Sequence, residues 1–218
     1  MTHAPRASVI IPNWNGLSLL RPCLDSLAMQ TLSPLGGAAE VIVVDNGSTD
    51  GSCETLAEAY PWVRTLALSD NLGYAGGCNA GIKAAKGEIL VLLNNDTEAE
   101  PDWLANLVAA LDRHPEAGSA ASRIMLYDRR DTLHSAGDLV RVDGTADSRG
   151  VWQPYGPPWD QEAWVFGGCG GAMAVRRQAI EEIGPFETRF FMYCEDVDLN
   201  WRAQRAGYRC IYAPDAVV

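Results

Sequence analysis

The chain has 218 residues, of which 47% are hydrophobic and 21% are charged, so it is long enough to bury a substantial core. It carries 17 Lys and Arg residues against 28 Asp and Glu residues, for a formal net charge of −11. This balance, without any basic stripe, excludes a nucleic-acid-binding surface. No apolar run approaches the roughly 18 residues of a membrane-spanning helix, so we expect a cytoplasmic chain with at most peripheral membrane contact.

The N-terminal half alternates short apolar runs with helical patterns. The runs at residues 7–11, 41–44, 63–68 and 89–93 have the length of strands, and apolar residues at helical spacing lie between them. The run at residues 89–93 is unbroken, as in a strand that is buried on both faces of a parallel sheet. The sequence therefore predicts an α/β fold with a mostly parallel central sheet flanked by helices.

The pattern changes after residue 117. Residues 128–159 are polar, rich in Gly, Pro and Asp, and weakly periodic, so we expect an irregular hairpin region or a mobile loop there. Strands are predicted at residues 120–127, 172–175 and 208–212, and a helix at residues 177–183. The six cysteines contain no C-x-x-C pair, and we expect buried thiols with neither a zinc site nor a disulfide framework.

Polar side chains follow the apolar runs, at the strand ends where open α/β sheets bind ligands. Asn94, Asn95 and Asp96 come directly after the fourth run. One carboxylate flanked by amides suits a hard cation that is shared with a phosphate, although a capped turn before the next helix explains the segment equally well. Asp45 ends the second run and could accept an imino N–H from a nucleotide base, or cap the following helix.

Several further residues could have either a functional or a structural role. Trp14 could stack on a base or cover the sheet edge. Residues 71–81 are rich in glycine but lack the G-x-G-x-x-G fingerprint of dinucleotide-binding proteins. We expect them to form a loop that leads into a helix at residues 80–86. Glu195 and Asp196 lie at the start of a predicted helix, where acidic side chains stabilise the positive end of the helix dipole. Alternatively, the aromatic run at residues 190–193 is expected to hold them against apolar surface, where a carboxylate is a stronger base. Among the histidines, only His134 is a candidate for function.

Six segments together resemble glycosyltransferase family 2, inverting enzymes with the GT-A fold, and in particular its rhamnosyltransferase-like members. They are SVIIPNWNG (8–16), VIVVDNGSTDGS (41–52), DNLGYAGGCNAG (70–81), ILVLLNNDT (89–97), FGGCGGAMAVRR (166–177) and FFMYCEDVDLNWRAQRAGY (190–208). They occur in family order and cover nearly the whole chain. The resemblance implies one GT-A domain over residues 1–218, with a nucleotide-sugar-binding half (1–125) and an acceptor-binding half (126–218).

The resemblance also implies a role for each matching position. Asp45 would meet the base, and the residues expected along the nucleotide are Pro12, Trp14, Asn15, Asn71, Asn79, Asn94 and Asn95. Asp96 stands in the Asp-x-Asp metal motif and would hold Mg²⁺ or Mn²⁺ on the donor diphosphate. Gly170 and Gly171 would shape the acceptor side. Asp196 would be the catalytic base, with Glu195 orienting the acceptor.

The implied reaction moves a sugar from a nucleotide-sugar donor, dTDP-rhamnose or a UDP-sugar, to a saccharide or lipid-linked acceptor in the synthesis of cell-surface polysaccharide. Two departures from the family pattern stand out. Asn94 replaces the first acid of Asp-x-Asp, and family members usually continue to a further histidine near the metal. We therefore expect the natural protein to extend beyond Val218.

Two other classes of protein remain as alternatives. A nucleotidyltransferase would share the sheet and the metal, but it usually has a basic glycine-rich loop near the first strand. Residues 13–16 contain neither Lys nor Arg, which counts against that class. The second alternative is a non-catalytic domain that binds a sugar nucleotide, which the replacement by Asn94 favours.

Overall fold

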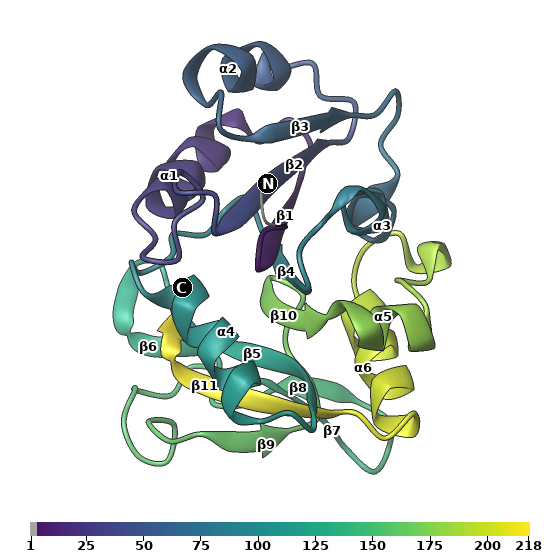
Figure 1. Cartoon of the computed structure of the whole chain (residues 1–218). Coiled ribbons are helices and arrows are strands. Elements are labelled where there is room, and N and C mark those ends of the chain that lie inside the picture. Colours follow the sequence, from purple (N-terminus) through teal and green to yellow (C-terminus); the bar gives the residue numbers. More distant parts are fainter. Residues whose placement is uncertain (1–3) are drawn as a thin grey trace.

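The computed structural model describes residues 4–218, and its framework is a nine-stranded sheet flanked by helices (Figure 1). The strands lie in the order β3-β2-β1-β4-β10-β5-β11-β9, and β6 pairs with β5. Their bounds are β1 (Ala7–Asn13), β2 (Ala39–Asp45), β3 (Arg64–Ala67), β4 (Ile89–Leu93), β5 (Ala117–Leu126), β6 (Arg129–Ser135), β9 (Ala163–Val165), β10 (Ala172–Arg176) and β11 (Arg209–Val217). The first four strands are parallel, while β10 runs antiparallel to both of its neighbours. The predicted mostly parallel sheet is thus confirmed.

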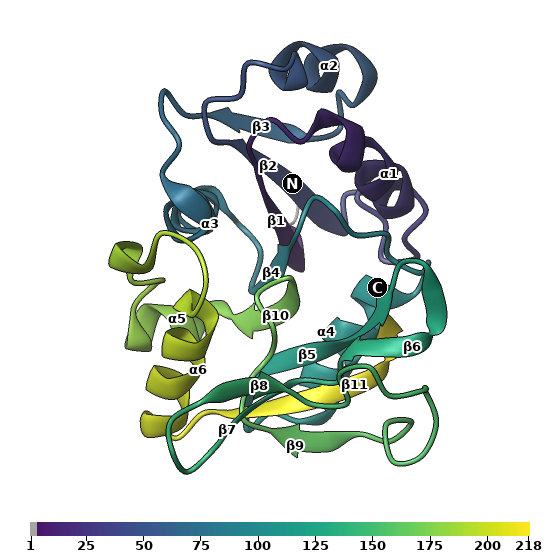
Figure 2. The ribbon, with the colours of Figure 1, turned by 180° about the vertical axis from the view of Figure 1, so that it is seen from behind.

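Helices cover both faces of this sheet (Figures 1 and 2). One face packs against α1 (Leu17–Ala28), α2 (Ser52–Ala59) and α4 (Trp103–Arg113). The other face packs against α3 (Gly73–Ala84), α5 (Arg177–Ile183) and α6 (Glu195–Arg205). A short 3₁₀ turn, η1 (Thr188–Phe190), precedes α6.

Strand β4 carries the core on both of its faces, as its unbroken apolar run predicts. All five of its residues are buried. Ile89, Val91 and Leu93 pack toward α1 and α4. Leu90 and Leu92 pack toward α3, α5 and α6 on the other face. Burying one such side chain contributes about 1.5–3 kcal/mol, so this strand stabilises the apolar core on both faces of the sheet.

The glycine-rich stretch is a helix and not the predicted loop, since α3 already begins at Gly73. The reason is close packing against the sheet. A Cβ on Gly81 would lie 2.3 Å from Ile10 Cγ2, and one on Gly77 would lie 2.7 Å from Asn46 Nδ2. The glycines therefore let the helix backbone approach β1 and the end of β2 more closely than any side chain would allow.

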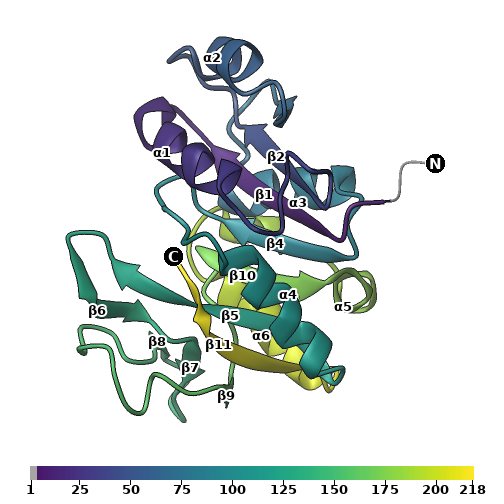
Figure 3. The ribbon, with the colours of Figure 1, turned by 60° about the vertical axis from the view of Figure 1, so that its left-hand side comes forward.

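Residues 128–159 are more regular than the sequence predicts. They contain β6 and a two-stranded hairpin of β7 (Asp138–Val140) and β8 (Ala146–Ser148). Backbone hydrogen bonds tie β6 to the following chain, including Leu133 N–H to Gln153 O and Trp152 N–H to Leu133 O. Figure 3 shows this region beside the C-terminal half of the sheet. Its weak periodicity reflects short strands with much exposed surface.

The cysteines are all free thiols, but their burial is only partly as predicted. Cys23, Cys78 and Cys210 are buried, Cys53 and Cys169 are half-buried, and Cys194 is exposed. The expectation of a buried thiol is therefore wrong for Cys194. Within residues 4–218, the helices are all too short or too polar to cross a lipid bilayer.

Substituting Gly81 by Ala tests the close packing of α3. We expect Gly81→Ala to destabilise the protein by about 1–3 kcal/mol, because the overlap with Ile10 outweighs the roughly 1 kcal/mol gain in helix propensity. Urea unfolding gives the difference. Gly36→Ala is the matched control, since its Cβ would meet only Ser33 at 3.6–3.8 Å. Equal stability of Gly81→Ala and the parent would contradict the packing argument.

Candidate active site

A groove of about 280 Å³ opens at the carboxyl ends of β1, β2 and β4. It brings together six of the residues predicted to bind the nucleotide or the metal: Pro12, Trp14, Asn71, Asn94, Asn95 and Asp96. Trp14 is 56% exposed, so its ring is available to a ligand. The groove is hereafter called the donor groove.

Asp45 does not line the donor groove. Its side chain is 2% exposed and accepts hydrogen bonds from Asn13 Nδ2 (3.2 Å) and from the backbone N–H of Ser48 (3.0 Å). Asn13 also donates to Ser52 Oγ and accepts from Asn95 Nδ2 at 2.8 Å. Asp45 thus supports the loops that form one wall of the groove, and its direct contact with a base is not supported by this geometry.

The neighbouring Asn46 does line the donor groove, and sequence reasoning missed it. It is 3% exposed, and its Nδ2 donates to Gly73 O at 3.3 Å, which fixes the orientation of the amide. Its Oδ1 has no hydrogen-bond partner among residues 4–218. A buried acceptor without a partner is costly, and a ligand donor that reached this oxygen would satisfy it.

Two other predicted nucleotide contacts have structural partners instead. Asn15 adopts a left-handed backbone (φ 50°) and its Oδ1 accepts from Thr49 N–H at 2.8 Å, which ties the first loop to the second. Asn79 exchanges two hydrogen bonds with the backbone of Phe186, one in each direction. Neither side chain is among those lining the donor groove. Their expected nucleotide contacts stay predictions.

Asp96 has the exposure that a metal ligand needs. Its carboxylate makes no hydrogen bond within the described chain, and Asn94, anchored by its N–H to Gly171 O (2.9 Å), lies beside it. No group of three or more His, Cys, Asp or Glu side chains in residues 4–218 could hold an ion alone. One carboxylate still fits Mg²⁺ or Mn²⁺, since such ions commonly bind through one or two carboxylates and substrate phosphates.

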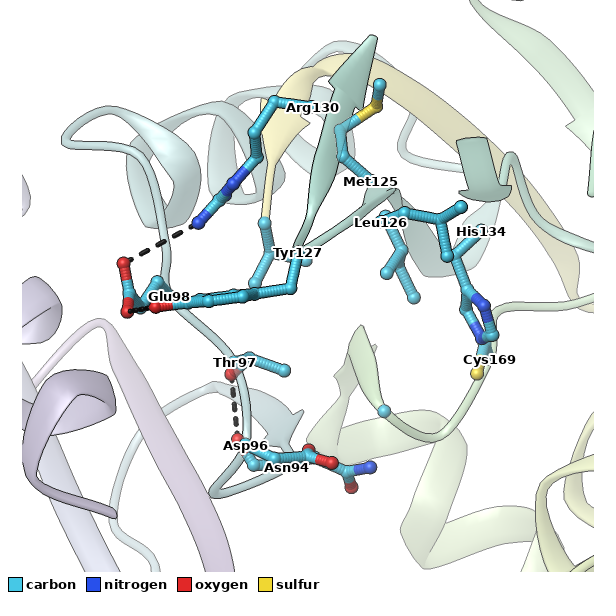
Figure 4. A pocket seen from close by; sticks show the side chains of 13 residues that line it. Asn94, Asp96, Thr97, Glu98, Met125, Leu126, Tyr127, Arg130, His134 and Cys169 are labelled. Atoms are coloured by element: carbon cyan, nitrogen blue, oxygen red, sulfur yellow. Dashed lines mark hydrogen bonds and ion pairs between the residues drawn. The ribbon is translucent and has the colours of Figure 1, made fainter. Parts of the chain in front are cut away.

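A second hollow of about 240 Å³ adjoins the donor groove (Figure 4). Asn94 and Asp96 line both, and the hollow then extends to Tyr127, Arg130 and His134 on the β5–β6 hairpin. Its lining also includes Thr97, Glu98, Cys169 and Gly171, of which Gly171 was expected on the acceptor side. We call it the Arg130 cavity.

Asp196 is bonded directly to that glycine-rich segment. Its Oδ2 accepts from Gly170 N–H at 2.8 Å, and its Oδ1 accepts from Val197 N–H at 2.8 Å. Tyr74 donates its hydroxyl to Gly170 O, and Asn200 Nδ2 donates to Gly168 O at 2.9 Å. The segment of residues 167–171 is therefore fixed from α3 and α6 at once, with Asp196 at its centre.

Glu195 and Asp196 point to different surroundings. Glu195 is 5% exposed, its Oε2 has no partner among the described residues, and burial raises its pKa. Asp196 is half-buried and faces the glycine-rich segment. The aromatic run at residues 190–193 does not bury these acids as predicted, because all four of its side chains are exposed. Phe191, Tyr193 and Cys194 have left-handed backbone, and Phe191 and Met192 line the donor groove.

Asp138, on β7, is a second acid near Asp196 that no sequence signal revealed. It is 6% exposed, and its side chain receives one long hydrogen bond, from Ser148 Oγ at 3.4 Å. Its backbone N–H donates to Gly167 O at 2.8 Å. Burial, together with the charge of Asp196, raises the pKa of Asp138 to about 7. Burial likewise raises the pKa of Cys169, in the same segment, to about 12.

The raised pKa of Asp138 makes stability depend on pH. In the unfolded chain an Asp titrates near about 4. Between about pH 4 and pH 7 the folded state holds a proton that the unfolded state has lost, so the parent protein loses stability as the pH rises. The side chain in Asp138→Asn cannot ionise. The free energy of unfolding of this variant, relative to that of the parent, should therefore be higher at about pH 8 than at about pH 4, by on the order of 2–4 kcal/mol.

Unfolding in urea at the two pH values measures this difference. Asp128→Asn is the control, because Asp128 is exposed on the turn between β5 and β6. The same stability difference between Asp138→Asn and the parent at both pH values would contradict a buried, neutral Asp138.

Comparison with known proteins agrees with this geometry. The family model "Glycosyl transferase family 2" matches residues 8–184. An N-acetylglucosaminyl-diphospho-decaprenol L-rhamnosyltransferase of Mycobacterium tuberculosis is 31% identical over 89% of this chain and 69% of its own length. The O-antigen biosynthesis protein RfbC of Myxococcus xanthus is 32% identical over 95% of this chain, which spans only 16% of that relative.

A solved structure is also similar. The mannosyltransferase PcManGT of Pyrobaculum calidifontis, determined in complex with GDP-Man and Mn²⁺, matches with a TM-score of 0.67 and 26% identity, over 99% of this chain and 56% of that one. Its fold supports the GT-A architecture that the six sequence segments implied. The chain belongs to glycosyl transferase family 2.

Proposed function

We propose that this chain transfers a 6-deoxyhexose, rhamnose, from a nucleoside-diphosphate donor to a lipid-linked saccharide, with inversion at the transferred carbon. The observation that carries the proposal is the junction at Asn94 and Asp96, where the donor groove meets the Arg130 cavity. A donor in the groove and an acceptor in the cavity would meet there. The mycobacterial rhamnosyltransferase supports the choice of sugar and acceptor, and RfbC supports a role in cell-surface polysaccharide synthesis.

The donor's base would lie against Trp14, with its imino N–H directed at Asn46 Oδ1. Uracil and thymine carry that donor, whereas cytosine and adenine do not. This choice is supported by the fixed orientation of the Asn46 amide and by its unpartnered oxygen. Asp45 then acts indirectly, by holding Asn13 and the turn at Ser48.

Asp96 would hold Mg²⁺ or Mn²⁺ against the donor diphosphate, with Asn94 beside it. When bound, such an ion neutralises charge on the departing diphosphate. The chain's own residues have two tasks. They must orient the donor and the acceptor at the junction, which removes much of the entropic barrier, and they must accept one proton.

Asp196 is proposed as the base that accepts this proton. The acceptor oxygen bonds to the anomeric carbon from the face opposite the diphosphate, the bond from that carbon to the diphosphate breaks, and the hydroxyl proton passes to a carboxylate oxygen of Asp196. Two backbone N–H groups hold that carboxylate in place. Glu195, which is buried, is assigned to anchoring the start of α6.

The proposal is tested by the release of nucleoside diphosphate from dTDP-rhamnose, UDP-N-acetylglucosamine and GDP-mannose. The acceptor is an N-acetylglucosaminyl diphosphate with a short alkyl chain. We expect release from dTDP-rhamnose only when acceptor is present, and loss of turnover on adding a chelator. Binding of the donor without any turnover would instead favour a non-catalytic sugar-nucleotide-binding domain.

Recognition of the base by Asn46 has a direct test. The parent protein should bind UDP roughly threefold to tenfold better than its N3-methylated analogue, which lacks the imino hydrogen. Asn46→Ala should bind both ligands alike, and calorimetry measures all four affinities. If Asn46→Ala retains the full preference for UDP, another group recognises the base.

The two adjacent acids should differ in their kinetics. Asp196→Asn keeps the size of the side chain and removes its basicity, so turnover should fall by roughly 10²–10⁴-fold while donor affinity stays unchanged. Glu195→Gln should retain most of the turnover, because that side chain is buried. Steady-state kinetics and donor titration measure both quantities. The opposite ranking of the two variants would assign the base to Glu195.

A further inference from the structure

Positive charge is unequally distributed around the junction of the two hollows. Within the described chain, no Lys or Arg side chain lines the donor groove. The Arg130 cavity has one arginine and one histidine, Arg130 and His134, beside the carboxylates of Asp96 and Glu98. For a chain of net charge −11, a guanidinium placed in a cavity beside the reaction site points to an anionic ligand.

Arg130 and His134 both lie on strand β6, and both side chains line the cavity. Figure 4 shows Arg130 at the end of the cavity near Glu98 and Tyr127, and His134 beside Cys169. An extended anionic group could therefore contact both side chains. The histidine end is also the end nearer to the glycine-rich segment that holds Asp196.

The guanidinium of Arg130 is held in place without using up its donors. It lies 5.1 Å from the centre of the Tyr127 ring and 3.5 Å from a carboxylate oxygen of Glu98. Glu98 receives a shorter hydrogen bond, 2.7 Å, from the Tyr127 hydroxyl. Arg130 forms a salt bridge with Glu98 but no hydrogen bond within residues 4–218, so its N–H groups can still donate to an oxyanion.

The wall next to Arg130 is apolar. Met125 and Leu126, from the end of β5, line the same cavity. A ligand that fits both parts combines an oxyanion with a hydrocarbon group. A phosphate is well matched, because arginine forms paired hydrogen bonds to phosphate oxygens.

We infer that the Arg130 cavity binds the diphosphate of the acceptor, with Arg130 and His134 as its specificity-determining residues. The inference rests on the proposed function and deepens it. The donor diphosphate is assigned to the opposite side of Asp96, where the groove contains Trp14 and Asn46. A diphosphate in the cavity would leave its attached sugar free to extend along Cys169 and Gly171 toward Asp196.

The test compares two acceptors that differ only in phosphate. One is N-acetylglucosaminyl diphosphate with a short alkyl chain, and the other is the same alkyl N-acetylglucosaminide without phosphate. We expect Arg130→Gln to raise KM for the diphosphate acceptor about tenfold to a hundredfold, while KM for the phosphate-free acceptor and the Kd for UDP stay within about twofold. His134→Gln should have a smaller effect in the same direction.

Arg129→Gln is the matched control. Arg129 is the adjacent exposed arginine of β6, but its guanidinium lies 5.4 Å from the centre of the Trp152 ring and it does not line the cavity. An equal rise of KM in Arg129→Gln, or with both acceptors in Arg130→Gln, overturns the inference. Weaker binding of UDP by Arg130→Gln also overturns it and assigns the arginine to the donor diphosphate.

Absence of turnover with dTDP-rhamnose in the parent overturns the proposed function itself. In that case, displacement of a fluorescent alkyl diphosphate from the parent and Arg130→Gln still decides whether the cavity binds diphosphate.

Discussion

The position of β10, antiparallel between β4 and β5, is the constraint on which the site depends. Its first residue, Ala172, pairs with Leu93, the last residue of β4. The chain that enters β10 must therefore pass the carboxyl end of β4, where Asn94 N–H donates to Gly171 O. A parallel strand in this place would enter at the opposite edge of the sheet. The antiparallel insertion brings residues 167–171, and through them Asp196, to the exposed carboxylate of Asp96.

The sequence predicted the parts of this structure that depend on local pattern. The apolar run of β4 indicated a strand buried on both faces, and the polar residues after it do line a groove. The antiparallel direction of β10 could not be read from the chain, because a five-residue buried strand has the same composition in either direction. A helix was predicted at residues 80–86, but the first part of α3, from Gly73, was missed because glycines are unfavourable for a helix in isolation. Here the close approach to Ile10 requires a glycine at position 81.

The candidate site was predictable to the level of a segment, but not always of a side chain. Asp45 and Asn46 are neighbours at a strand end, and only the tertiary structure determines which of them turns inward to Asn13 and which lines the groove. Asp138 lies in a polar stretch without periodicity, where nothing in the sequence separates a buried acid from the exposed ones. Arg130 and Arg129 are likewise adjacent and differ only in the face of β6 that carries them.

The thiol of Cys169 has a consequence for the stereochemistry of the reaction. It lies in the wall of the Arg130 cavity, on the segment that is hydrogen-bonded to Asp196. Attack by the thiolate would form a covalent sugar–enzyme species, and a second displacement would restore the original configuration. Burial raises the pKa of this thiol to about 12. The sulfur therefore stays protonated and weakly nucleophilic at neutral pH, which fits the proposed single displacement.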